Sequence, residues 1–127
     1  MGLPIQATVS LGTDIVDIMR IRRMVKNKRF LNRVFTSEEV AYCADKKNSA
    51  QHYAVRFAAK EAVWKALSGR TSLRGIGHKE ISVTRDRDGK PGIKFSARLA
   101  RYQSGISLSL SHTKDYALAV ALYQGRS

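Results

Sequence analysis

Two carboxylates and one lysine are the side chains of this sequence whose types and spacing best suit phosphate chemistry. Glu61 and Lys65 stand four positions apart in "RFAAKEAVWKAL", so a helix would place them on one face, with Phe57 and Ser68 beside them. Asp14 lies far from them, among the β-branched residues of "SLGTDIVDIMRI". A carboxylate can hold Mg²⁺, and a lysine binds phosphate as a point charge. The three residues are therefore candidates for a site that acts on a phosphorylated substrate.

Each of these residues also has a structural interpretation. The strand-like alternation of residues 7–13 gives way to helical spacing from Ile15 onward, so Asp14 could cap a helix, with Asp17 at a capping-box-like distance. The carboxylate and the lysine of the long helix could instead form a solvated ion pair, which stabilises a helix by only a few tenths of a kcal/mol, although the flanking Phe57 and Ser68 weaken this alternative. The residues alone leave both choices open.

His112 is the histidine whose position suggests a role. It ends the strand-like segment "ISLSLSH", on the face of Leu110 and beside a turn that begins at Thr113. A histidine on an apolar face is more often a satisfied core residue, and that alternative stays open. No second His or Cys stands at the spacing of zinc ligands, which argues against a structural zinc site. His52 and His78 carry no interpretation by themselves.

The totals of the chain are those of one ordinary domain. The 127 residues are 43% hydrophobic, which is enough for a core, so we expect a single domain over residues 1–127. Cys43 is the only cysteine, which excludes an internal disulfide and agrees with a reducing compartment. The first residues lack the pattern of a signal peptide, and no apolar run reaches the roughly 20 residues of a membrane span. We expect a cytoplasmic protein with no membrane partner.

The charge balance predicts an acidic partner. With 23 Lys and Arg against 10 Asp and Glu, the formal net charge is +13, which favours nucleic acid, anionic lipid, a phosphorylated ligand or an acidic protein. Many of the basic residues gather in the stretch 20–33. Nucleic-acid binding would favour aromatic residues between the basic ones for stacking, but Phe30 and Phe35 are spaced like core residues. A nucleic-acid-binding module is therefore a weaker alternative.

The first half of the chain favours one strand followed by helices. Residues 7–13 alternate as a strand, and "KRFLNRVF" is typical of a short helix. Thr36 and Glu39 have the spacing of a capping box at a helix start. The longest helix is predicted over about residues 50–67, and Ser68-Gly69 would end it.

The second half favours antiparallel strands. "KEISVTR" and "IKF" are separated by the turn sequence "DRDGKPG", and Ser96 could cap a short helix after them. "ISLSLSH" and "YALAVALY" form the last two strands. In the final strand Ala117, Ala119 and Ala121 share one face, which would let a helix or another subunit approach closely. We expect an α+β fold with a long central helix packed on an antiparallel sheet.

Four stretches resemble one known family, in order along the chain. "LGTDIVDIMRI", "RFAAKEAVWKAL", "DGKPGIKF" and "LSLSHTKDYALAVAL" are similar to holo-acyl-carrier-protein synthase, the small bacterial type of 4′-phosphopantetheinyl transferase. The resemblance implies transfer of 4′-phosphopantetheine from coenzyme A to a serine of apo-acyl carrier protein, with release of adenosine 3′,5′-bisphosphate. It also implies an α+β homotrimer with active sites at subunit interfaces.

The resemblance assigns roles to individual residues. Asp14 and Glu61 match the carboxylates that hold Mg²⁺, so the metal would offset the charge of Asp14. Lys65 matches a contact to coenzyme phosphate, and with the two carboxylates it would form the catalytic set. His112 and Thr113 match further contacts to coenzyme A.

A basic surface for the carrier protein is implied as well. Arg20 and Arg29 match basic positions that dock the acidic acyl carrier protein. The remaining alternative to an enzyme, besides nucleic-acid binding, is a non-catalytic scaffold that binds a carrier protein and in which Asp14 only caps a helix.

Overall fold

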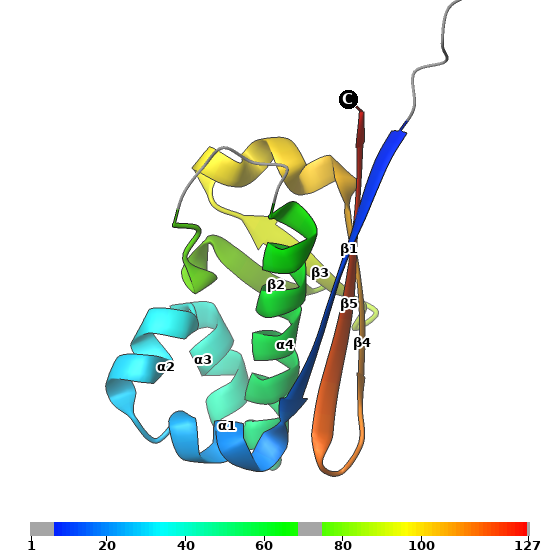
Figure 1. The fold of residues 1–127 in the computed structure, drawn as a ribbon. Helices are drawn as coiled ribbons and strands as arrows, with labels where there is room; N and C mark the ends of the chain where they lie inside the picture. Colours follow the sequence, from blue (N-terminus) through cyan, green and yellow to red (C-terminus); the bar gives the residue numbers. More distant parts are fainter. Residues whose placement is uncertain (1–6, 69–74, 127) are drawn as a thin grey trace, which may run out of the picture.

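The computed structural model describes residues 7–68 and 75–126 (Figure 1). The chain begins with strand β1 (Ala7–Asp17) and continues through helices α1 (Ile18–Met24), α2 (Lys28–Val34), α3 (Ser37–Ala44) and α4 (Ser49–Leu67). After residue 75 follow the 3₁₀ turn η1 (His78–Glu80), strands β2 (Ile81–Arg85) and β3 (Pro91–Phe95), the 3₁₀ segment η2 (Ala97–Gly105), and strands β4 (Ile106–His112) and β5 (Tyr116–Arg126). The predicted α+β class is confirmed.

Strand β1 is longer than its sequence pattern predicts. We expected it to end before Asp14, which would then cap a helix, but pairing with β5 continues through Asp17. Asp17 is the cap of α1: its carboxylate accepts hydrogen bonds from the backbone N–H groups of Met19 at 2.9 Å and Arg20 at 3.3 Å. Apolar residues such as Ile15 lie on the outer face of β1. Together with the apolar residues of α1, they produce the helix-like spacing that predicted an earlier helix start. The interpretation of Asp14 as a helix cap is therefore wrong.

Helices α3 and α4 begin and end close to the predicted positions. Thr36 Oγ1 accepts a hydrogen bond from the N–H of Glu39 at 3.2 Å, and the Glu39 carboxylate accepts one from the N–H of Thr36 at 2.8 Å. This is the predicted capping box. At the end of α4, the N–H of Ser68 donates to the carbonyl oxygen of Trp64, whereas Gly69 lies outside the described residues.

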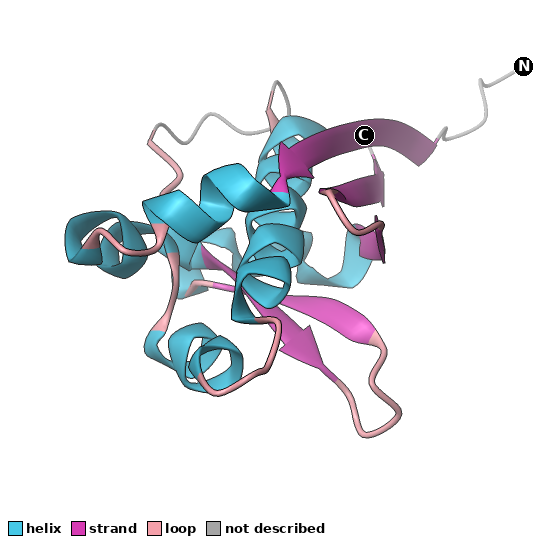
Figure 2. Cartoon of the chain, turned by 90° about the horizontal axis from the view of Figure 1, so that it is seen from below, coloured by secondary structure: helices cyan, strands magenta, loops and turns pink. Residues whose placement is uncertain are grey.

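Strand β5 is the centre of a three-stranded antiparallel sheet with the order β1-β5-β4. The register sets Asp14 opposite Ala119 and His112 opposite Ala117, so both side chains belong to the face of the buried alanines. Helix α4 covers this inner face, and the hairpin of β2 and β3 packs against another side of α4 (Figures 1 and 2). The expected packing of a long helix on an antiparallel sheet is confirmed.

The inner face and α4 approach each other closely because the residues between them are small. Three alanines of β5 are fully buried there: Ala117, Ala119 and Ala121. On β1, a Cβ atom added to Gly12 would lie 1.8 Å from the carbonyl oxygen of Ala62, so only glycine fits at this position. Next to it, Ser10 Oγ donates a hydrogen bond to the carbonyl oxygen of Ala66 at 2.7 Å.

The second half contains the predicted strands and one cap that differs. β2 and β3 pair as a hairpin whose turn holds Gly89 at φ +82°, a conformation that favours glycine. Ser96 precedes η2 but does not cap it; its Oγ donates to Glu80 Oε1 at 2.9 Å instead.

The buried apolar side chains of the described residues form one hydrophobic core. Phe35 is 1% exposed within it, and Phe30 is half-buried against it. The prediction that these two aromatic residues are core residues is confirmed.

Replacing Gly12 tests the close approach of β1 to α4. Overpacking of this kind costs about 1–3 kcal/mol, occasionally more, and here the obstacle is backbone. We expect Gly12→Ala to lower the free energy of unfolding in urea by at least about 2 kcal/mol. Gly77→Ala is the matched control, because its methyl group would meet only Glu80 Oε2 at 4.0 Å. Equal unfolding midpoints for the two variants would contradict the close approach.

Candidate active site

Asp14 and Lys65 meet where β1 crosses α4. The Lys65 ammonium lies 3.2 Å from Asp14 Oδ1 and donates to the carbonyl oxygen of Thr13 at 2.9 Å. These residues line a hollow of about 230 Å³ together with Ile15 and Leu118. The lysine side chain is 46% exposed and the aspartate side chain 17%. Because nearly half of the lysine side chain is exposed, it can turn toward a ligand.

Burial raises the pKa of the Asp14 carboxyl above its usual value. The neighbouring Lys65 and Arg20 oppose this shift, while the charge of Glu61 adds to it. Glu61 and Asp14 are therefore close enough to repel each other. A cation beside them would relieve both the repulsion and the cost of burial.

Glu61 has a partner that the sequence analysis did not predict. Its Oε1 lies 3.2 Å from Nε2 of His78, and the His78 ring stacks on Phe57 with centroids 5.7 Å apart. The alternative of an i, i+4 ion pair between Glu61 and Lys65 is not realised: in the described part of the chain, Glu61 pairs with His78 and Lys65 with Asp14. That interpretation is wrong: Lys65 connects α4 to β1, and Glu61 connects α4 to η1.

A buried ion pair lies behind Glu61. Lys60 Nζ is 2.7 Å from Glu39 Oε1, and both side chains are at most 1% exposed. Lys60 also donates to the carbonyl oxygens of His78 at 3.0 Å and Ile81 at 2.8 Å, while Glu39 Oε2 accepts from the N–H of Val83 at 2.9 Å. Burial lowers the pKa of Lys60, against the attraction of Glu39. The pair joins α3, α4 and β2 and holds η1 beside the site.

His112 and Thr113 lie at the opposite end of α4 from Lys65. His112 Nε2 is 3.0 Å from Nε2 of Gln51, in the first turn of α4. Gln51 and Lys65 are about 21 Å apart along the helix axis at 1.5 Å per residue. His112 is exposed, so its interpretation as a core residue is wrong. The two predicted parts of the coenzyme site therefore stand apart within one copy of the chain.

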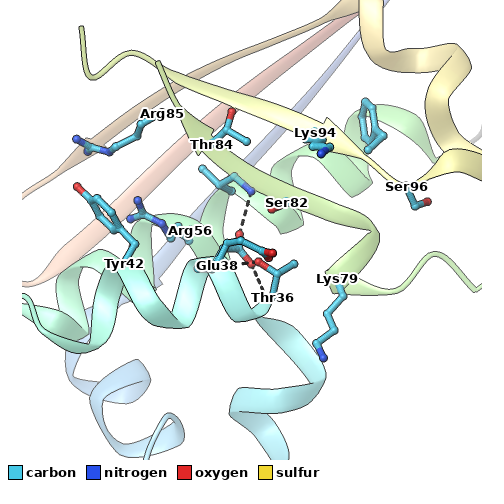
Figure 3. A pocket seen from close by; sticks show the side chains of 13 residues that line it. Thr36, Glu38, Tyr42, Arg56, Lys79, Ser82, Thr84, Arg85, Lys94 and Ser96 are labelled. Atoms are coloured by element: carbon cyan, nitrogen blue, oxygen red, sulfur yellow. Dashed lines mark hydrogen bonds between the residues drawn. The ribbon is translucent and has the colours of Figure 1, made fainter. Parts of the chain in front are cut away.

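A basic cluster around Tyr42 was not predicted. Lys46 Nζ and the guanidinium carbons of Arg56 and Arg85 lie 4.4, 4.3 and 5.5 Å from the Tyr42 ring centroid. Tyr42, Arg56 and Arg85 stand together at one end of a pocket of about 670 Å³ (Figure 3). Arg56 is buried, and its Nε has no hydrogen-bond partner among the described residues. The only sequence signal was the position of Arg56 at the head of "RFAAKEA".

The basic cluster belongs to the same end of α4 as His112. Burial lowers the pKa of His52, and the charges of Arg56, Arg85, Lys46 and His112 lower it further. One region of the chain thus holds the carboxylates and Lys65, and a second region holds His112 and the basic cluster.

Arg20 and Arg29 are exposed on α1 and α2. Arg20 is near enough to Asp14 for its charge to lower the pKa of that carboxyl. The basic stretch of the sequence therefore begins beside the carboxylates.

The outer face of the three-stranded sheet is apolar along β1 and β5, whereas β4 presents Ser107, Ser109 and Ser111 there. No described element covers this face (Figure 1). Five large apolar side chains of β1 and β5 are 40–65% exposed on this face: Val9, Leu11, Ile15, Tyr116 and Leu118. Contiguous apolar patches of this kind mark interaction surfaces.

Residues 7–68 and 75–126 contain no group of three His, Cys, Asp or Glu side chains that could hold a metal ion. The described helices also include none that is long and apolar enough to cross a membrane. Cys43 is buried, and burial raises the pKa of its thiol to about 11.

The chain is similar to known proteins over nearly its whole length. The 4′-phosphopantetheinyl transferase superfamily matches residues 10–121, and the chain belongs to this superfamily. The holo-[acyl-carrier-protein] synthase of Protochlamydia amoebophila is 42% identical over 120 residues, which cover 91% of this chain and 98% of that protein. The protein of the same name from Geobacter sp. (strain M21) is 43% identical over 121 residues, covering 89% and 95%. The resemblance seen in the sequence is confirmed.

Solved structures share the fold. Holo-[acyl-carrier-protein] synthase of Neisseria meningitidis superimposes with a TM-score of 0.77 at 34% identity, covering 90% of this chain and 96% of that one. The Helicobacter pylori protein of that name, in complex with coenzyme A, gives a TM-score of 0.74 at 31% identity and covers 92% and 99%.

Proposed function

We propose that the chain transfers 4′-phosphopantetheine from coenzyme A to a serine hydroxyl of apo-acyl carrier protein and releases adenosine 3′,5′-bisphosphate. The observation that supports this proposal best is the meeting of Asp14, Lys65 and Glu61 where β1 crosses α4. The curated relatives are named for this reaction, and a solved relative binds coenzyme A.

The two carboxylates fit a Mg²⁺ ion. Asp14 and Glu61 offer only oxygen donors, and Mg²⁺ usually takes one or two protein carboxylates, with substrate phosphates and water as its other ligands. Burial and the charge of Glu61 keep the pKa of Asp14 raised even though Lys65 is near, so the pair would gain from more positive charge. We assign Mg²⁺ to Asp14 and Glu61. When bound, it would neutralise charge on the pyrophosphate and on the leaving group.

The reaction exchanges one bond at phosphorus for another and moves one proton. The serine oxygen bonds to the phosphorus that carries pantetheine, and the bond from this phosphorus to the bridging oxygen breaks. The electron pair stays on that oxygen, which leaves as part of adenosine 3′,5′-bisphosphate. The serine proton passes to one of the carboxylates, directly or through water. The chain's contribution is positioning and charge rather than a covalent intermediate.

Lys65 is suited to hold a phosphate during this step. Among the described residues, its ammonium is anchored by the Asp14 carboxylate and the Thr13 carbonyl oxygen, and its side chain is 46% exposed. A small rotation would exchange these anchors for a phosphate oxygen, which a lysine binds as a point charge.

The basic cluster suits the phosphate-bearing nucleotide end of coenzyme A. Cations surround the Tyr42 ring, and the Nε of buried Arg56 is left without a partner among the described residues. Charge-assisted bonds from arginine to phosphate are among the stronger hydrogen bonds in proteins. His112 and Thr113, at the same end of α4, would add contacts there.

We further propose a homotrimer whose active sites lie between subunits. Arg56 and Lys65 project from opposite sides of α4, because nine positions make about two and a half turns. A coenzyme held by Lys65 of one copy would therefore meet the basic cluster and His112 of a neighbouring copy. The uncovered apolar face of the sheet provides a surface on which copies would pack.

Arg20 and Arg29 would receive the acidic acyl carrier protein. Both are exposed in the basic stretch, and Arg20 acts on Asp14 through its charge. A carrier protein bound there would present its serine near the carboxylates.

The roles of the two carboxylates can be tested by charge removal. We expect Asp14→Asn and Glu61→Gln each to slow the release of adenosine 3′,5′-bisphosphate at least about 100-fold, because several kcal/mol of charge stabilisation is lost. Both should unfold at the parent temperature. Asp17→Asn is the matched control. Asp17 is the last residue of β1 and the N-cap of α1, and asparagine caps a helix equally well. Near-parent rates for either site variant at low Mg²⁺ would contradict the metal assignment.

Mixing two inactive variants tests whether sites are shared. Asp14→Asn and His112→Ala trimers, unfolded together and refolded as an equal mixture, should regain activity at low coenzyme A concentration. Random assembly gives about a quarter of the sites an intact Asp14 from one copy and an intact His112 from its neighbour. If each site belongs to one copy, the mixture will stay as inactive as its components.

Separate Michaelis constants test the docking surface. Rim charges mainly change association rates, so Arg20→Glu should raise the KM for carrier protein about tenfold or more and leave the KM for coenzyme A nearly unchanged. Lys65→Ala should raise the KM for coenzyme A and leave the KM for carrier protein nearly unchanged. Arg101→Glu makes the same change of charge on η2 and should affect neither constant. If Arg20→Glu raised the KM for coenzyme A as much as the KM for carrier protein, Arg20 would belong to the coenzyme site.

The two alternative functions make different predictions. A nucleic-acid-binding module would bind arbitrary oligonucleotides with steep salt dependence and would not bind coenzyme A, but Phe30 and Phe35 pack in the core and offer no stacking platform. A non-catalytic scaffold would bind carrier protein without transfer, and its supposed cap at Asp14 is absent. A cytoplasmic location stays a prediction from the sequence.

A further inference from the structure

His78 is held in one orientation against Glu61. Its ring stacks on Phe57 with planes 17° apart, and its Nε2 lies 3.2 Å from Glu61 Oε1. An ionised carboxylate can only accept hydrogen bonds, so in this contact His78 is the donor. Glu61 and His78 also line a cavity of about 370 Å³ with Trp64, which places the pair at a cavity wall.

The backbone of His78 is fixed as firmly as its ring. Buried Lys60 donates to the His78 carbonyl oxygen at 3.0 Å. On the other side, Glu80 Oε2 accepts from the N–H of Gly77 at 3.0 Å, and Arg98 Nε contacts Glu80 Oε1 at 2.6 Å. The contact with Arg98 holds the pKa of Glu80 down at about 2, so this anchor keeps its charge at neutral pH.

This arrangement leaves one oxygen of Glu61 available. In the described part of the chain, His78 is the hydrogen-bond partner of the Glu61 side chain, and it uses only Oε1. Glutamate is a long side chain that loses rotamer freedom when it is ordered. A fixed donor on one oxygen orders the carboxylate before a ligand arrives and directs the other oxygen to that ligand.

We infer that His78 is a positioning residue that orients Glu61 for the cation and thereby sets the affinity of the site for it. This inference rests on the proposed function, since it takes Glu61 as a metal ligand. The sequence alone assigned no role to His78.

The test uses two substitutions of His78 in the full chain with coenzyme A present. Affinity for Mn²⁺, as a probe for Mg²⁺, is measured by calorimetry, and the Mg²⁺ dependence of transfer is measured beside it. His78→Phe keeps a ring over Phe57 but has no donor, and we expect it to weaken Mn²⁺ binding about 10- to 100-fold. His78→Gln restores an N–H donor and should bind Mn²⁺ within about threefold of the parent.

The outcomes separate this inference from the proposed function. If the parent transfers phosphopantetheine with Mg²⁺ and His78→Phe keeps parent Mn²⁺ affinity, the positioning role alone is overturned. If both variants lose Mn²⁺ affinity equally and unfold at lower temperature, the role of His78 is structural and the inference is also overturned. If the parent itself neither binds Mn²⁺ nor transfers the group, both the proposed function and the inference fail.

Discussion

The site depends on one steric constraint, the close contact of helix α4 with the inner face of the three-stranded sheet. The contact exists because the residues between them are Gly12 and the alanines of β5, and a methyl group on Gly12 would collide with the backbone of α4. At this distance the ends of two side chains, Asp14 and Lys65, reach each other at 3.2 Å. A larger residue in this layer would move β1 outward and separate the aspartate from both Lys65 and Glu61.

The same helix divides the functional groups between two regions. The side chain of Lys65 contacts β1 and that of Glu61 contacts η1. The side chain of Arg56 lies against Tyr42 in the basic cluster. One copy of the chain thus places Lys65 and the exposed His112 near opposite ends of α4. In the account proposed here, a long ligand such as coenzyme A joins the two regions across neighbouring copies, and the apolar outer face of the sheet explains how those copies associate.

Local rules predicted the elements, and contacts distant in sequence escaped them. The capping box of Thr36 and Glu39 was readable because both partners lie within one turn, and the alanine face followed from simple alternation. The end of β1 was predicted too early because Ile15 is apolar but lies on the exposed face of the strand. Burial within one copy of the chain does not explain an apolar residue at this position. The contact of Glu61 with His78 could not be predicted, since no periodicity connects a helix face to a separate 3₁₀ turn later in the chain.

The central claim is that this chain catalyses metal-dependent transfer of phosphopantetheine. The direct measurement is the intact mass of apo-acyl carrier protein after incubation with this chain and coenzyme A, with Mg²⁺ or with a chelator. The account predicts a mass gain of one phosphopantetheinyl group, lost when the target serine is replaced by alanine and lost with the chelator. A carrier protein of unchanged mass in the presence of Mg²⁺, or the same gain under chelation, would contradict it.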